Sequence, residues 1–403
     1  MNPQPFRSPP RWWPSRFNRV VVRLLAWRRN QDLRRQGIER IDVIGPDPVA
    51  AALQAGQGVL LVSNHSYHFD SFVLIQAGLW GNWHPQIMTA WQVFMMYRWF
   101  GRWSLQRHGC FSVNREGIDT QALRHAVSIL SAGTHPLAIY PEGDIFHSND
   151  RVMPFREGAA AIALLAARQQ QRPIVAIPCA MKCFYTASPL PELEAMLSRL
   201  EQRIHWRPSP ELPVIDRIYR FGSGFLALKE VEYLGTPQTG TIRQRIRSLS
   251  QALVEQVSQR RRLTLKGPDT LEQIRHLRAQ LIRQTDTGRE SPRRTEQELI
   301  DWHIDLEDLF FATQLCSYHG DYAAEKPSLE RMAETIDKFE EDVFSLPAPT
   351  PRGKRRAVIQ FGEPIPVTGA GQNAARLTLE LEQAVQLLLE DLNRRHEQQI
   401  LPA

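Results

Sequence analysis

The sequence has few cysteines and no long apolar run, and both absences narrow the classes of protein to consider. Its four cysteines, Cys110, Cys179, Cys183 and Cys316, form no CxxC pair and are too scattered for a disulfide framework or a zinc site. A reducing compartment is therefore expected. No segment approaches the roughly 18 consecutive apolar residues that a membrane-spanning helix needs, and no apolar signal-peptide centre is found near the N-terminus. We expect a cytoplasmic protein that does not cross a membrane.

Positive charge is concentrated at one end of the chain. The formal net charge is +6, and residues 1–40 contain ten arginines against one aspartate and one glutamate. Residues 15–29 have apolar side chains at helical spacing, and Trp12 and Trp13 precede them among arginines. This composition predicts a basic-aromatic interfacial helix in residues 1–36 that binds an anionic membrane surface through residues 11–29. An ordinary helix packed on its own core is the alternative. No nucleic-acid partner is expected, because the rest of the sequence contains no recognisable nucleic-acid-binding module.

Strands and helices alternate from residue 38 onward. Apolar strands are predicted at RIDVIG, GVLLVSN, CFSVN, PLAIYPEG and RPIVAIPCAMKCF, with amphipathic segments between them. Helices of about 10 to 15 residues between strands predict an α/β fold with a mostly parallel, twisted sheet flanked by helices. We expect an α/β core over 37–187, a charged helical insertion over 188–348, and a return strand of the core with a C-terminal helix over 349–403.

Polar residues follow three of the predicted strands, in SNHSYHFD, SVNREG and IYPEGD. The carboxyl ends of parallel strands are where reactive groups gather in such sheets. The first of these segments contains His65, His68 and Asp70, which are compatible with a metal site, a catalytic dyad or a polar strand cap. The spacing H-x-x-H-x-D matches no metal geometry that we can name, and the other two strand ends offer no further histidine.

A dyad of His65 and Asp70 requires only a tight turn. A carboxylate on one ring nitrogen fixes the histidine tautomer and raises the basicity of the other nitrogen, which prepares a general base for a substrate hydroxyl. The sequence has no GxSxG elbow and no obvious nucleophilic serine or cysteine. It therefore favours direct attack by an activated substrate hydroxyl. The simple helix cap stays open as an alternative.

Four ordered segments resemble the glycerolipid acyltransferase family, which includes lysophosphatidate and glycerol-3-phosphate acyltransferases. NHSYHFD resembles the family's NHx4D motif, GCFSVNR its GxxFxxR block, YPEG its [FY]PEG block, and IVAIPCA its VxxPV-type strand. PFREG and VIQFGEPIPV are similar to flanking landmarks of the same fold. The resemblance covers about residues 40–185 and 355–368.

The resemblance implies a reaction and a set of roles. His65 would deprotonate the acceptor hydroxyl and Asp70 would orient His65. The hydroxyl of a lysophosphatidate-like glycerolipid acceptor would attack the thioester of acyl-CoA or acyl-carrier protein, as in a 1-acylglycerol-3-phosphate O-acyltransferase. No metal or other cofactor is implied. The family would place the protein peripherally on a membrane. It also implies four substrate-binding residues: Asn64, Arg115, Glu142 and Gly143.

One position departs from the family pattern. The family continues P-E-G-T-R-S, whereas this chain has PEGDIFHS, with Asp144 and Ile145 in place of threonine and arginine. Arg115 would bind the acceptor phosphate by charge-assisted contacts, and an acid close to that phosphate would repel it. Either Arg151 or Arg156 compensates for the acid, or the acceptor carries no phosphate there.

Two functions of another class remain open. The chain could be a catalytically inactive lipid-binding relative that keeps the scaffold. It could also be a metal-dependent hydrolase that uses His65, His68 and Asp70. The insertion is compatible with a lid, a partner-binding module, a cover for the acyl chain or simple scaffold.

Overall fold

The computed structural model describes residues 10–399 except 118, 287–294 and 370, so the start of the predicted interfacial segment lies outside the described residues. The chain divides into two compact units. The first, here called the α/β unit, comprises Pro9–Glu192 and Thr350–Ala403. The second, here called the helical unit, is Leu193–Pro349. The units are described separately.

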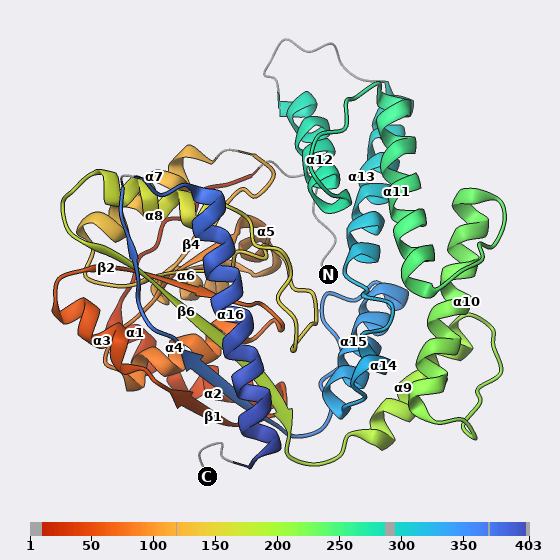
Figure 1. Cartoon of the computed structure of the whole chain (residues 1–403), viewed down its shortest axis with the longest axis horizontal. Coiled ribbons are helices and arrows are strands. Elements are labelled where there is room, and N and C mark those ends of the chain that lie inside the picture. Colours follow the sequence, from red (N-terminus) through yellow and green to blue (C-terminus); the bar gives the residue numbers. More distant parts are fainter. Residues whose placement is uncertain (1–9, 118, 287–294, 370, 400–403) are drawn as a thin grey trace. The chain divides into compact units, whose positions relative to one another are not determined.

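The α/β unit is built on one sheet. Within the described residues, eight strands form it in the order β1-β7-β6-β2-β5-β3-β4, with β8 also paired to β6 (Figure 1). β7 and β8 run antiparallel to β6, and the other neighbouring pairs are parallel. This confirms the predicted mostly parallel sheet. The strands are β1 (Ile38–Ile44), β2 (Gly58–Ser63), β3 (Gln86–Ala90), β4 (Cys110–Val113), β5 (Leu137–Ile139), β6 (Ile174–Tyr185), β7 (Arg355–Phe361) and β8 (Ile365–Val367).

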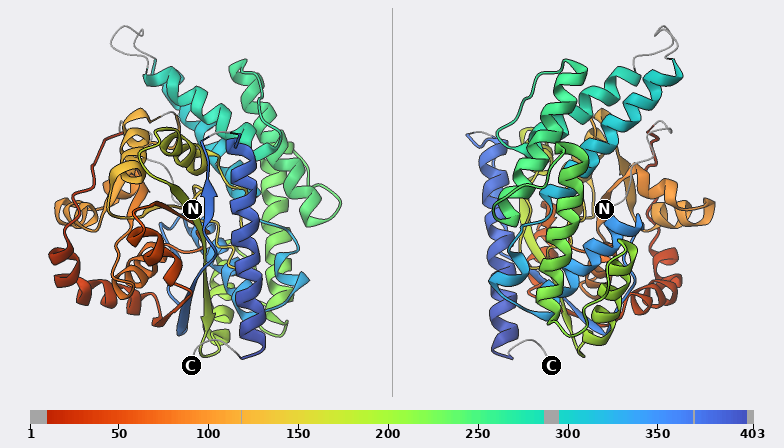
Figure 2. Two further views of the ribbon diagram at one scale, coloured as in Figure 1. Left: turned by 60° about the vertical axis from the view of Figure 1, so that its left-hand side comes forward. Right: turned by 90° about the vertical axis from the view of Figure 1, so that its right-hand side faces the viewer.

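Helices cover both faces of the sheet. They are α1 (Arg19–Leu24), α2 (Ala26–Arg35), α3 (Asp47–Gln54), α4 (Asp70–Trp80), α5 (Trp91–Met96), α6 (Trp99–Arg107), α7 (Thr120–Ala132), α8 (Gly158–Arg168) and α16 (Ala374–Glu397). Successive side chains of a strand point to opposite faces, so the apolar run of β2 serves two cores. Leu60 and Val62 join the core beneath α7, α8 and α16, whereas Val59 and Leu61 join the core beneath α1 to α5. The long helix α16, blue in Figure 2, lies against β6.

The N-terminal segment differs in detail from its prediction. The predicted single helix over 15–29 is two helices, α1 and α2, which meet at Leu25. Residues 15–18 are not helical. The backbone N–H groups of Arg16 and Asn18 instead donate to the carbonyls of Gln106 and Arg107, which lie at the end of α6 and lack partners within that helix. The Asn18 side chain then caps α1 by accepting from the Val21 N–H.

Four elements of the α/β unit were not predicted from the sequence: β3, α5, α6 and β8, because the single predicted return strand is two strands, β7 and β8. β3 has only five residues and no clear alternation of buried and exposed side chains, so the period-two signal of a strand is lacking. α5 is similarly short, and α6 has no buried residue. Elements without a consistent buried face leave no periodic pattern in the sequence.

The helical unit contains helices only, among its described residues. They are α9 (Leu190–Arg203), α10 (Val214–Leu234), α11 (Ile242–Arg261), α12 (Thr270–Asp286), α13 (Glu296–Cys316), α14 (Tyr322–Glu325) and α15 (Leu329–Phe344). Helices α10 to α13 share an apolar core that includes Leu253, Leu277 and Leu306. Thr241 and Thr295 begin α11 and α13 with complete capping boxes, which satisfy N–H groups that a helix leaves unpaired. Nowhere in the described chain is a helix both long and apolar enough to cross a membrane.

Candidate active site

The turn between β2 and α4 brings His65 and Asp70 together. The structure places Nδ1 of His65 3.0 Å from Oδ2 of Asp70. The same carboxylate oxygen accepts the backbone N–H groups of Ser66 and Tyr67, each at 2.8 Å. Asp70 is the first residue of α4, where the helix dipole favours a negative charge. The carboxylate is therefore held in place by the turn itself.

The environment of the pair suits a general base. A carboxylate oxygen can only accept, so Nδ1 carries the proton and Nε2 is the ring nitrogen that can take one up. The Asp70 side chain is buried, whereas that of His65 keeps a fifth of its surface exposed. The His65 ring stacks on Tyr140, with 4.3 Å between ring centroids and 25° between planes. The imidazole is thus oriented on one side and reachable on the other.

His68 lies apart from this pair. The ligand atoms of His65, His68 and Asp70 do not all come within 4.8 Å of one another. The His68 ring instead lies 5.9 Å from the ring of His147. Because a metal centre needs its ligand atoms gathered around one point, the arrangement does not fit the metal alternative for these three residues.

Glu142 connects the ends of two neighbouring strands. It follows β5, which pairs in parallel with β2, and its Oε1 accepts the backbone N–H of His65 at 2.8 Å. Its Oε2 accepts the N–H of Met153 at 3.4 Å. The side chain is almost wholly buried, and this burial raises the pKa of Glu142 well above that of an ordinary carboxyl group. Its substrate-binding role stays a prediction, while its contacts position His65.

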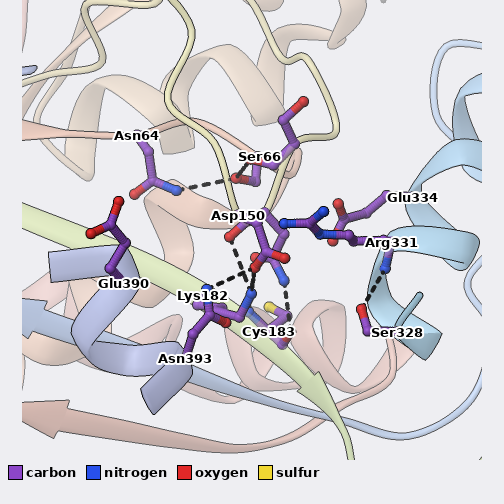
Figure 3. A network of polar contacts seen from close by, with 12 residues as sticks. Asn64, Ser66, Asp150, Lys182, Cys183, Ser328, Arg331, Glu334, Glu390 and Asn393 are labelled. Carbon is purple, nitrogen blue, oxygen red and sulfur yellow. Dashed lines mark hydrogen bonds and ion pairs between the residues drawn. The ribbon is translucent and has the colours of Figure 1, made fainter. Parts of the chain in front are cut away.

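Asn64 makes a similar connection to β6. Its side chain is fully buried; Nδ2 donates to the carbonyl of Met181 and Oδ1 accepts the N–H of the same residue, both at 2.8 Å. Nδ2 also donates to Oγ of Ser66 at 3.1 Å (Figure 3). These contacts fix the start of the turn between β2 and α4, and the substrate-binding role of Asn64 likewise stays a prediction.

Arg115 and Gly143 meet beside Glu142. Nη1 of Arg115 donates to the Gly143 carbonyl and to Oδ1 of Asp144, the latter at 2.7 Å. Nη2 of Arg156 donates to Oδ2 of Asp144 at 3.2 Å. Gly143 has φ +80°, and a Cβ there would overlap the Arg156 guanidinium. Arg156, one of the two arginines considered as compensation for the acid, therefore does face it. The sequence indicated the departure at Asp144 but not its two-sided pairing.

Loop 144–157 is held in place by side chains of α16. No local pattern in the sequence predicted this contact between the loop and the helix. The N–H groups of Val152 and Phe155 donate to side chains of that helix at 3.1 and 2.7 Å. Asp150 pairs with Lys182 of β6 and accepts from α16 at 3.1 Å (Figure 3). The loop in turn supplies the Ser148 carbonyl to Oγ of Ser66. The α16 residues involved are Glu382, Gln386 and Asn393.

Comparison with known protein families bears directly on this site. Residues 40–182, which contain every residue of the site except those of α16, match the model of the Acyltransferase family. This part of the chain is an acyltransferase domain. The predicted acyltransferase family is thereby confirmed for residues 40–182, which run from within β1 to Lys182 of β6, while the glycerolipid acceptor stays a prediction.

The comparisons with individual proteins add less. A solved structure, the 1-acyl-sn-glycerophosphate (LPA) acyltransferase PlsC from Thermotoga maritima, matches at 17% identity with a TM-score of 0.24. The match covers 35% of this chain and 49% of that chain, so about half of that protein is spanned. At this TM-score the likeness carries no argument about the acyltransferase domain. A comparison with curated proteins gave no match.

The cysteines of the acyltransferase domain are poorly suited to act as nucleophiles. Cys110 and Cys179 are buried, and burial raises the pKa of each thiol to about 12. The reactive form of a cysteine is the thiolate, which is scarce at neutral pH under these conditions. This favours direct attack by a substrate hydroxyl over a covalent thioester on either cysteine.

The buried Glu142 predicts a pH dependence of stability. Above about pH 4.5, its ordinary pKa, the unfolded chain loses the Glu142 proton, whereas the folded domain keeps it until the pH passes the raised pKa. Between these values stability falls as pH rises, with a limiting slope of about 1.4 kcal/mol per pH unit. Glu142→Gln keeps an oxygen acceptor but cannot ionise, so we expect this slope to be reduced in the variant. Urea unfolding at several pH values measures it; parallel wild-type and variant profiles would contradict the assignment.

Proposed function

We propose that the protein transfers a fatty acyl group from an acyl thioester to a hydroxyl of a glycerolipid-type acceptor. The observation that supports this most directly is the contact between His65 Nδ1 and Asp70 Oδ2, at the carboxyl end of β2 in an acyltransferase domain. The donor is acyl-CoA or acyl-carrier protein, and no cofactor besides this co-substrate is proposed.

The geometry suggests the order of bond changes. Nε2 of His65 takes the proton of the acceptor hydroxyl, and the oxygen attacks the thioester carbonyl. When the tetrahedral intermediate collapses, the C–S bond breaks and the thiolate takes the proton back from His65. Asp70 stabilises the positive charge that the imidazole carries between these steps. The burial of Asp70 strengthens that interaction, because little water screens it.

The family resemblance implies an acceptor of the lysophosphatidate type, as for a 1-acylglycerol-3-phosphate O-acyltransferase. Whether the phosphate monoester itself is bound depends on the charges beside His65, which include Asp144 as well as two arginines. Arg115 and Arg156 supply positive charge beside Glu142, which hydrogen bonds to the backbone of His65. Arginine suits phosphate because its planar guanidinium donates two parallel hydrogen bonds. A phosphate at this place would lie close to the turn between β2 and α4, but it would have to compete with Asp144, which pairs with both arginines.

We also propose that the enzyme works peripherally at an anionic membrane surface on the cytoplasmic side. Trp12 and Trp13 are not available for this, since they pack inward against Phe111 and Phe94. Other apolar side chains of α1 and α2 are exposed among arginines. They form what we call the N-terminal apolar patch: Val20, Leu24 and Trp27. Exposed apolar groups next to basic ones are typical of interfacial helices.

Replacing Leu24 with serine tests the membrane role. Loss of one leucine from an interface should lower binding to vesicles that contain anionic lipid by about tenfold. Leu387→Ser on α16 is a matched control, because the two leucines are 67% and 64% exposed. Vesicle sedimentation measures the effect. Equal binding by both variants, or binding that does not weaken with salt, would contradict the proposed surface.

The proposed reaction is tested with a labelled acyl thioester and a panel of lysolipids with and without phosphate. Formation of an acylated lipid with release of thiol supports the proposal. Lipid binding without any acyl transfer would support the inactive relative instead. Stoichiometric zinc or iron in the purified protein, together with hydrolysis in place of transfer, would support the metal-dependent hydrolase.

A further inference from the structure

We propose that Asp144 selects against acceptors with a phosphate monoester, because its own carboxylate occupies the two arginines that would otherwise hold the phosphate. The inference rests on the proposed acyl transfer and narrows its acceptor class: the acceptor is a lysolipid whose group beside the reacting hydroxyl is uncharged or carries a single negative charge, and not lysophosphatidate itself.

The contacts of Asp144 are those expected of a bound anion. Its two oxygens are shared between two cations, with Oδ1 2.7 Å from Nη1 of Arg115 and Oδ2 3.2 Å from Nη2 of Arg156. A phosphate bridging the same arginines would place its oxygens at corresponding positions. The Asp144 carboxylate therefore occupies the place that an anionic ligand bound by both Arg115 and Arg156 would take.

The cluster is open to a ligand. The side chains of Arg115, Asp144 and Arg156 keep 20%, 17% and 27% of their surfaces exposed. A pair sealed in a core would only stabilise the fold, whereas a partly exposed cluster can exchange an internal partner for an external one. The cluster of Arg115, Asp144 and Arg156 also lies close to the proposed base. Asp144 is two residues after Glu142, which accepts the backbone N–H of His65.

Charge decides which acceptors fit. The two arginines and Asp144 sum to a net charge of +1, whereas a phosphate monoester carries about −1.5 to −2 at neutral pH. With Asp144 in place, the two arginines cannot neutralise both the carboxylate and such a group, so up to about one negative charge stays unbalanced. A singly charged group would be neutralised, and an uncharged one would leave the internal pairing intact. Without Asp144 the cluster carries +2 and matches the monoester.

The turn holds Asp144 in this place. Gly143 adopts φ +80°, which a residue with a side chain rarely adopts, and the backbone N–H of Arg156 donates to the Pro141 carbonyl at 2.9 Å. Arg115 donates to the Gly143 carbonyl as well. Both arginines are thus tied to the same turn as the acid, so the carboxylate does not depend on a flexible side chain alone.

Asp144→Asn tests the proposal, because it removes the charge and keeps the shape. We expect the variant to bind inorganic phosphate at least tenfold more tightly than the wild-type protein, as measured by calorimetry. We also expect its ratio of kcat/KM for lysophosphatidate over monoacylglycerol to rise at least tenfold. Both gains should disappear when Arg115→Gln is added. Asp144→Ser is expected to behave like Asp144→Asn, and provides a second variant if the first fails to fold.

The control is Asp47→Asn, which removes the same charge from the exposed start of α3, after β1. β1 runs opposite to β2, so its end lies at the other edge of the sheet. Phosphate binding by Asp144→Asn that is no tighter than that of the wild type or of Asp47→Asn overturns the proposal, as does a gain that survives loss of Arg115. Binding needs no turnover, so a protein without acyl transfer would refute the proposed function while leaving this measurement intact.

Discussion

His65→Ala is expected to lower kcat/KM for acyl transfer by between about a hundredfold and ten-thousandfold, the usual contribution of a positioned general base. Nε2 of His65 is the ring nitrogen left to take up the acceptor proton, because Nδ1 is engaged by Asp70. Without the imidazole, the hydroxyl must attack while still protonated. Steady-state assays with a saturating acyl thioester give the effect.

His68→Ala is the matched control for this experiment. It removes another imidazole from the same turn, but one that does not join His65 and Asp70 in a cluster. We expect its rate to stay within about tenfold of the wild-type rate, which is less than the roughly hundredfold low end of general-base effects. Lipid binding should be retained in both variants. If His65→Ala and His68→Ala lose activity equally, or if neither does, His65 is not the base.

Glu201→Ala is expected to reduce the stability of the helical unit by about 3 to 5 kcal/mol, because it leaves a buried cation without its partner. Arg217 and Glu201 each keep only 1% of their side-chain surface exposed. The guanidinium donates to both carboxylate oxygens, from Nη2 at 2.7 Å and from Nε at 3.3 Å. Its remaining contacts, to Ser198 and the Glu194 carbonyl, cannot neutralise the charge.

An exposed ion pair of the same unit is the control. Lys229 and Glu232 lie 2.7 Å apart with side chains 28% and 53% exposed, so Glu232→Ala should cost less than about 1 kcal/mol. Urea unfolding followed by circular dichroism compares the variants. Replacing both members of the buried pair, by Glu201→Leu with Arg217→Met, should recover most of the loss. Equal effects of Glu201→Ala and Glu232→Ala would show that burial does not set the strength of these pairs.

The sequence predicted the parts of the site whose partners are close in the chain. His65 and Asp70 are five residues apart, and the turn that joins them follows a strong apolar strand and begins a helix. Alternation of strands and helices likewise predicted the sheet. Both depend on periodic patterns within short windows, which can be detected in a single sequence.

Contacts between distant segments could not be predicted in this way. Asn64 pairs with Met181, 117 residues further on, and Phe155 pairs with Glu382, 227 residues further on. No pattern within either segment specifies its partner. At Trp13 a local pattern gave a wrong expectation. The arginines around it suggested a membrane interface, but its ring stacks on Phe94 with 5.2 Å between ring centroids. Packing of the finished fold overrode the local composition.

The pairing of β6 with β7 has a consequence for biosynthesis. Thr186 and Lys354, whose backbones hydrogen bond where these strands meet, are 168 positions apart. Ribosomes add about 5 to 20 residues per second, so β6 waits roughly ten to thirty seconds for β7 after it has been translated. During that time the backbone N–H and C=O groups along about half of one edge of β6 have no partner strand. Such an unpaired edge can template aggregation. Loop 144–157 waits longer still, since α16 is translated after β7. The nascent enzyme is therefore most vulnerable, and not yet active, while its helical unit is being made.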